Sequence, residues 1–175
     1  MAGDIKLQYA ASVALTVTNL HSLASSQTWE AGWTSGTVAN GTNEYVDYLV
    51  SGTFTTHASN RQAGSINVYV YAPLNDTPTW PDLFSTGTEG TEGAATVHDT
   101  EQRDSGMRLL TSITVDATAS DVYTFPPTGI AQLFGGHVPN NFSIFVAQNA
   151  STTTTAGLAA AGSALYYTPL WYQYT

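Results

Sequence analysis

Residues 45–72 read YVDYLVSGTFTTHASNRQAGSINVYVYA. Apolar side chains fall on alternate residues from Val46 to Phe54, and the alternation resumes from Ile66 to Ala72 after a polar break. A period of two is typical of a strand that buries one face. We therefore expect an antiparallel pair of strands that shares one buried face. A single pair cannot keep that face dry, so other strands must cover it.

Further strands are indicated on both sides of this pair. Stretches with alternating or strand-forming residues recur at 6–18, 29–33, 109–115, 122–125, 142–146 and 163–175. Asn40-Gly41 is a strong turn pair, 130–134 suits a single helical turn, and no long amphipathic helix is present. Pro169 interrupts the last stretch, which we expect at or near a sheet edge. The pattern predicts an all-β fold, an antiparallel β-sandwich with a jelly roll as one candidate topology, in a single domain over residues 1–175.

Residues 73–106 break the regular pattern. Pro73, Pro78 and Pro81 exclude a central strand, and glycine and acidic residues follow as far as Gly106. A loop of this length within one domain is usually either functional or loosely ordered. We expect a long, acidic surface excursion that forms a partly packed flap, with a short strand at 94–97.

The charge balance excludes one class of partner. Only 10% of the residues are charged, the formal net charge is -9, and the four basic residues are scattered. Binding to a phosphate backbone requires a cationic surface. We therefore expect no nucleic-acid partner.

Cysteine usage and the first residues bear on the compartment. The chain has no cysteine, so disulfides and thiolate metal sites are excluded. Residues 1–6 lack the basic and then apolar run of a secretory signal, and no stretch is apolar enough to span a membrane. We expect folding in a cytoplasm and no membrane association.

Catalytic motifs do not stand out. The four histidines, at 21, 57, 98 and 137, form no close-spaced metal pattern. His98, Asp99 and Ser105 include the residue types of a hydrolytic triad, but no GxSxG motif accompanies them. We assign no catalytic residue and no cofactor. The acidic excursion offers a calcium candidate, because hard cations bind several carboxylates. Its residues are Glu89, Glu92, Asp99, Glu101 and Asp104.

Aromatic residues offer two further candidate sites. Three tryptophans could stack on a sugar, although packing in the core is the alternative for each: Trp29, Trp33 and Trp80. The aromatic residues near the end of the chain exceed what one edge strand normally buries, so an intersubunit contact competes with core packing. These residues are Tyr166, Tyr167, Trp171, Tyr172 and Tyr174.

Seven segments together carry a resemblance to a known group of proteins. In chain order they are WEAGW (29–33), NGTN (40–43), YVDYLV (45–50), INVYVYA (66–72), FGGHVP (134–139), FSIFVAQN (142–149) and ALYY (164–167). The chain resembles small virion structural proteins of tailed bacteriophages. This resemblance implies a non-enzymatic, multicopy component of the particle, namely a decoration or cement protein on the capsid, and it transfers no catalytic residue.

The sequence thus favours one function and leaves an alternative open. The expected function is a virion protein, assembled in the host bacterial cytoplasm, that binds the major capsid protein or other virion proteins and its own copies as a homo-oligomer. Edge strands and the C-terminal aromatic residues are the expected contacts. The alternative is a carbohydrate-binding, lectin-like module on the virion surface or tail.

Overall fold

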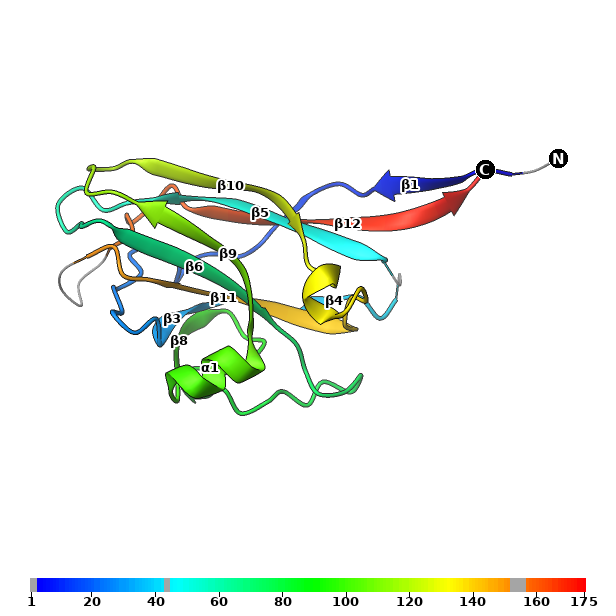
Figure 1. Cartoon of the computed structure of the whole chain (residues 1–175), viewed down its shortest axis with the longest axis horizontal. Helices are drawn as coiled ribbons and strands as arrows, with labels where there is room; N and C mark the ends of the chain where they lie inside the picture. The colour runs from blue at the N-terminus through cyan, green and yellow to red at the C-terminus, as the bar shows by residue number, and fades with distance from the viewer. Residues whose placement is uncertain (1–2, 43–44, 152–156) are drawn as a thin grey trace.

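Two antiparallel sheets form the body of the protein, which this computed structural model describes for residues 3–42, 45–151 and 157–175. In these residues one sheet has five strands: β1 (Ile5–Tyr9), β2 (Val13–Ala14), β5 (Asp47–Thr55), β10 (Val122–Gly129) and β12 (Ala164–Tyr174). The other has seven: β3 (Ala31–Thr34), β4 (Val38–Ala39), β6 (Gly64–Tyr71), β7 (Phe84–Thr86), β8 (Gly93–Val97), β9 (Arg108–Val115) and β11 (Asn141–Gln148). The sheets pack together around a shared apolar core (Figure 1). The expected antiparallel β-sandwich is confirmed.

The strands pair in a nested pattern. The five-stranded sheet has the order β1-β12-β5-β10, with β2 also on β12, and the other sheet has the order β7-β8-β3-β11-β6-β9, with β4 on β11. Early strands therefore pair with late strands in reverse order: β1 with β12, β3 with β11, β5 with β10 and β6 with β9. Each sheet combines strands from both halves of the chain, so neither half contains a complete sheet.

Strands β5 and β6 do not pair with each other, so this part of the expectation for residues 45–72 was wrong. Strand β5 pairs with β10 and β12 in one sheet, whereas β6 pairs with β9 and β11 in the other. The connection between them crosses from one sheet to the other, and both strands contribute to the same core. Alternation reports that a strand buries one face, but it does not report which strand lies beside it.

The core between the sheets is formed by alternate residues of the strands. Burial alternates along the whole of β5, with Tyr48, Val50 and Phe54 inside. Phe142 of β11 packs edge-on against Tyr48, with ring centroids 5.1 Å apart. Removing a large apolar side chain from water contributes roughly 1.5–3 kcal/mol. These rings are therefore a main source of stability for the sandwich.

Residues 73–106 are packed more fully than expected. Strand β7 pairs with β8, and β8 pairs with β3, so the segment extends the seven-stranded sheet, and the predicted strand at 94–97 is confirmed. Helix α1 (Thr100–Gly106) follows, and the Asp99 side chain caps its first turn. The segment covers the face of the sheet that points away from the main core. The second apolar cluster on that face comprises Tyr69, Tyr71, Leu83, Phe84, Ala95, Val97, Met107, Phe145 and Ala147.

Two strands contain proline, with different surroundings. Pro126 and Pro127 lie in β10 at the sheet edge, where a missing amide donor is tolerated, and the register shifts between Phe125 and Thr128. Strand β12 has β5 on one side and β1 or β2 on the other for much of its length. Strand β12 is therefore not the edge strand but lies next to the edge strand β1, which agrees with the expected position at or near a sheet edge.

Candidate functional site

A two-stranded ribbon projects from one end of the sandwich. Strand β5 pairs with β12 as far as Leu170, whereas β1 pairs with residues Leu170 to Tyr174. Figure 1 shows β1 and the end of β12 extending past the other strands, with the C-terminus at the tip. We call residues 5–9 and 170–174 the ribbon. A strand pair without further support is marginally stable in water, so contact with another surface would stabilise it.

One face of the ribbon is apolar apart from its phenol hydroxyl groups. Directly opposed residues of an antiparallel pair share a face, and the register gives the pairs Ile5–Tyr174, Leu7–Tyr172 and Tyr9–Leu170. We call these six residues the ribbon face. Tyr174, Ile5, Tyr172 and Tyr9 have exposed fractions of 72, 71, 62 and 61%. A cluster of exposed apolar side chains of this kind marks an interaction surface.

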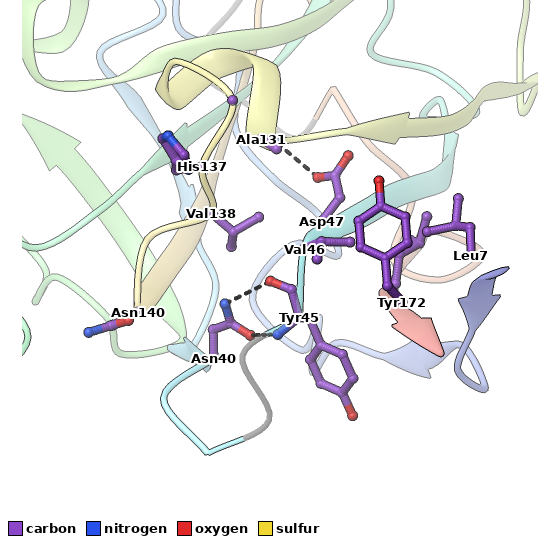
Figure 2. Close-up of a pocket in the computed structure, with 12 residues that line it drawn as sticks. Leu7, Asn40, Tyr45, Val46, Asp47, Ala131, His137, Val138, Asn140 and Tyr172 are labelled. Atoms are coloured by element: carbon purple, nitrogen blue, oxygen red, sulfur yellow. Dashed lines mark hydrogen bonds between the residues drawn. The ribbon is translucent and has the colours of Figure 1, made fainter. Parts of the chain in front are cut away.

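An open groove of about 630 Å³ lies where the ribbon meets the sandwich (Figure 2). Its lining includes Leu7, Leu170 and Tyr172 from the ribbon and His137 and Val138 from the segment after β10. That segment begins with the 3₁₀ helix η1 (Ala131–Phe134), which confirms the expected helical turn. The next two residues are glycines with φ of 74° and 92°, a conformation that glycine adopts without strain. This turn carries the chain from η1 to the wall of the groove.

Asp47 fixes that wall to the sheet. Its Oδ1 accepts hydrogen bonds from the backbone amides of Tyr48, Ile130 and Ala131 at 2.7, 3.0 and 2.9 Å. Ile130 and Ala131 begin the helical turn, so one carboxylate oxygen joins β5 to η1 (Figure 2). Hydrogen bonds to an ionised acceptor are stronger than neutral ones. These hydrogen bonds fix η1 relative to β5 and therefore hold the wall of the groove in place.

The structure divides the predicted C-terminal interface residues. Tyr172 and Tyr174 belong to the ribbon face, and Tyr166 is exposed further back on β12. Tyr167 instead packs on the core, with its ring centroid 5.8 Å from that of Tyr48. Burial, together with the nearby Tyr45, raises the pKa of Tyr167. Core packing, the alternative to an intersubunit contact, accounts for the position of Tyr167.

Trp171 lies on the opposite side of the ribbon from the ribbon face. It is half-buried, and its ring centroid is 6.1 Å from that of Tyr45. Lys6, Gln8 and Gln173 share this opposite face. Trp171 is therefore separated from the exposed tyrosines with which it was grouped.

The sequence analysis missed the contribution of β1 to the site. Ile5, Leu7 and Tyr9 supply half of the ribbon face, and the apolar–polar alternation of residues 5–9 is visible in the sequence. The expected opening strand at 6–18 is divided into β1 and β2, both of which pair with β12. The alternation could have identified the strand, but not its position beside the C-terminal tyrosines.

The three tryptophans considered for sugar binding do not form an exposed platform. Trp33 is fully buried, and its indole Nε1 donates a hydrogen bond to Glu92 at 2.8 Å. Trp29 and Trp80 are half-buried and pack against the second apolar cluster. Stacking on a sugar requires an open ring face. The sugar-stacking assignment is wrong for Trp33, and packing accounts for the positions of the other two.

The five acidic residues considered for calcium do not converge on one point. No group of three or more His, Cys, Asp or Glu side chains that could hold a metal ion occurs in the parts of the chain that the structure describes. Each carboxylate instead has its own partners. Glu89 accepts hydrogen bonds from the amides of Leu83 and Phe84, Asp99 from Gln102, Glu101 from Thr100, and Glu92 from Asn19 and Trp33, whereas Asp104 forms an ion pair with Arg103. The calcium assignment is therefore wrong for this set.

Glu92 has a structural role instead. Its carboxylate accepts hydrogen bonds from the Asn19 amide, the Asn19 side chain and the Trp33 indole at 2.9, 2.9 and 2.8 Å. Burial opposes ionisation of the carboxyl, but these three bonds outweigh burial and hold its pKa below the usual 4.5. The ionised Glu92 side chain, which lies directly before β8, therefore links this segment to Trp33 of β3 and to Asn19 in the segment before β3.

The residues of the hydrolytic-triad hypothesis are not assembled. The His98 ring lies 3.4 Å from Asp82, not beside Asp99, which caps α1. The Ser105 hydroxyl donates to the carbonyl of Gln102 at 3.2 Å. A triad requires the nucleophile to bond to the histidine and the histidine to the acid. That geometry is absent from these three residues.

Comparison with known proteins gives no relative for this chain. No protein-family model, no curated protein and no solved structure matches it. Within the described residues, no helix is both long and apolar enough to cross a membrane. The ribbon face and its groove are therefore the main guide to function.

Proposed function

We propose that the chain is a non-enzymatic structural protein of a bacteriophage virion, a decoration or cement protein that binds the capsid lattice and its own copies. The ribbon face carries this proposal. It projects from the body, it is rich in aromatic residues and it has no charged side chain. Aromatic residues are enriched and charged residues depleted at the centres of protein interfaces. In this proposal the partners are the major capsid protein or other virion proteins, and assembly takes place in the host bacterial cytoplasm.

The strand order supports the proposal at the level of the fold. We infer a jelly roll, because the nested orders β1-β12-β5-β10 and β3-β11-β6-β9 correspond to a double sheet built from two Greek keys. Jelly rolls occur in viral capsid proteins and also in lectins. A fold does not establish a function, so the argument depends on the surface.

The charge balance supports a protein partner over a nucleic acid. With a net charge of -9 and four scattered basic residues, the chain offers no cationic surface for a phosphate backbone. On a shell, neighbouring copies are held at fixed spacing, so modest contacts act together and each can be weak. A small apolar surface suits such a role.

Purified particles from the source of this sequence provide the test. Mass spectrometry of density-gradient fractions should find the chain at constant ratio to the major shell protein, and electron cryomicroscopy should show sandwich-sized density on the shell. Fractions of host proteins of similar density serve as the control. If intact particles lack the chain, the virion assignment is wrong.

Carbohydrate binding is the second candidate, and the groove is the observation that favours it. Tyr172 contributes an aromatic ring to the same groove as the polar groups of Asp47 and His137, and the groove has a size typical of small-molecule sites. A glycan array, run with and without a chelator, tests this candidate. Binding that disappears in Tyr172→Ala would support it, and an array with no signal under either condition would exclude it for the glycans tested.

A further inference from the structure

We infer that the ribbon face is a two-fold contact between copies of this chain, in which two ribbons lie antiparallel and face to face. The inference deepens the proposed function and rests on its self-association component alone. In this arrangement the Leu7–Tyr172 pairs of the two copies lie at the centre. The Ile5–Tyr174 pair of each copy meets the Tyr9–Leu170 pair of the other.

The exposed area suits a dimer contact. Three tyrosines and Ile5 are each more than 60% exposed, and whole aromatic side chains bury about 150–250 Å² each, so the ribbon face exposes on the order of 500 Å². A stable interface of standard size takes ~800 Å² from each partner. Two ribbon faces together would bury roughly 1,000 Å² in total, at the lower end of specific interfaces. The adjoining groove adds to this area, which favours a geometry that uses both surfaces.

The two-fold arrangement uses both surfaces at once. Leu7, Leu170 and Tyr172 belong to the ribbon face and also line the groove, so the groove opens beside the base of the ribbon. When two ribbons lie antiparallel, the tip of one reaches the base of the other. The Tyr174 ring of one copy therefore enters the groove of the second copy.

A polar group in the groove matches this occupant. The Oδ1 atom of Asp47 takes three backbone amides, whereas its Oδ2 accepts no hydrogen bond from any described residue. The polar atoms of the ribbon face are phenol hydroxyl groups, which donate one hydrogen bond each. The Tyr174 hydroxyl of a second copy supplies a donor for Oδ2 as its ring fills the apolar side of the groove.

Charge favours a second copy at this face and disfavours contacts elsewhere. Each chain carries a net charge of -9, so most surfaces of two copies repel each other. The ribbon face has no charged side chain, because Lys6 lies on the opposite side of the ribbon. A two-fold interface uses the same patch on both copies, so that patch must be self-complementary. Three cross-strand pairs with one pair at the centre meet this condition, with Tyr9 supplying the exposed side chain of the pair whose other member, Leu170, is buried at the base of the ribbon.

Sedimentation and light scattering of the purified chain, from micromolar to millimolar concentration, test the inference. The wild type should reach twice the chain mass. Tyr172→Asp buries a charge at the centre of the contact and should weaken association about 100-fold or more. The matched control is Gln173→Asp, the same added charge one residue later on the opposite face, which should dimerise like the wild type.

Cross-linking gives a second readout that does not depend on a destabilising variant. The chain has no cysteine, so single cysteines can be introduced freely. Leu7→Cys places two thiols beside the two-fold axis and should form a covalent dimer on mild oxidation, whereas Lys6→Cys on the opposite face should not. Circular dichroism checks that each variant is folded. If Tyr172→Asp is not folded, the Leu7→Cys cross-link decides whether the two ribbon faces meet.

Several results would overturn the two-fold contact. A strict monomer at all concentrations would overturn it. So would an oligomer that Tyr172→Asp leaves intact. An oligomer of more than two copies that Tyr172→Asp dissociates would also overturn it. If the chain is monomeric but Tyr172→Asp abolishes binding to shells, the face belongs to a lattice protein and not to a second copy. A ribbon dimer that is absent from particles would instead remove the virion assignment and leave the self-contact in place.

Discussion

Replacing Glu92 by glutamine tests whether a residue of the acidic segment stabilises the sandwich. A hydrogen bond to a charged acceptor contributes roughly 1.5–3 kcal/mol. Glu92 accepts three such bonds, but it is partly exposed, and glutamine keeps one acceptor oxygen for the Trp33 indole. We therefore expect Glu92→Gln to lower the free energy of unfolding by about 1–2 kcal/mol.

Glu92→Ala should have a larger effect. It removes every acceptor atom and leaves the N–H of the fully buried Trp33 without its partner. An unpaired buried donor adds its own desolvation cost, so we expect a loss of about 3 kcal/mol. For a chain of this size each kcal/mol lowers Tm by about 2–4 °C.

The sign of the pH dependence follows from the lowered pKa of Glu92. The stabilisation is fully present above the pKa of the carboxyl in the unfolded chain, near 4.5, and is lost as the pH falls through the lower pKa of the folded state. Glutamine does not titrate. The stability difference between wild type and Glu92→Gln should therefore be full at neutral pH and close on acidification below about 4.5.

Urea unfolding followed by tryptophan fluorescence at several pH values measures both effects. Glu101→Gln is the matched control, because Glu101 is exposed on α1 and, among the described residues, accepts a hydrogen bond only from the Thr100 hydroxyl. It should change stability by no more than about 0.5 kcal/mol. If Glu92→Gln unfolds at the same urea concentration as wild type, or if the difference does not change with pH, the structural role of Glu92 is refuted.

Two further substitutions test the strand packing and the groove. A Cβ at Gly32 of β3 would overlap the carbonyl oxygen of Val146, so Gly32→Ala should lower the free energy of unfolding in urea by about 1–3 kcal/mol. Gly93 has open space around it, so the control Gly93→Ala should change that free energy by no more than about 0.5 kcal/mol. Equal stability of the two variants would contradict the close approach of β3 to β11. Asp47→Ala leaves the Ala131 amide without its acceptor, so it should lower the free energy of unfolding by about 1–3 kcal/mol and speed hydrogen exchange at that amide. Unchanged exchange would show that Asp47 does not hold η1 in place.

Much of the secondary structure could be predicted from local pattern. The alternation over 46–54, 66–72 and 109–115 corresponds to β5, β6 and β9, each within a few residues. The helical turn at 130–134 and the short strand at 94–97 were also predicted correctly. These predictions succeeded because the side-chain period of a strand or helix follows from the geometry of a few consecutive residues.

The candidate site could be predicted only in part. The excess of C-terminal aromatic residues pointed to β12, and Tyr172 and Tyr174 do lie on the exposed ribbon face. The sequence could not separate them from Tyr167, since all three are tyrosines within one strand and differ only in what covers them. It also could not show that Glu92 bonds to Trp33, which lies 59 residues earlier.

By itself, the sequence determined that the protein is built from short strands, which residues of a regularly alternating strand such as β5 face the core, and that charge for binding nucleic acid is lacking. The tertiary structure alone decided that β5 and β6 belong to opposite sheets, that β1 lies beside the end of β12, and that the acidic segment continues a sheet. The physical reason is the range of the interactions. Side-chain periodicity is local, whereas strand pairing depends on backbone hydrogen bonds between residues as distant as Ile5 and Tyr174, which are chosen only when the whole core is buried.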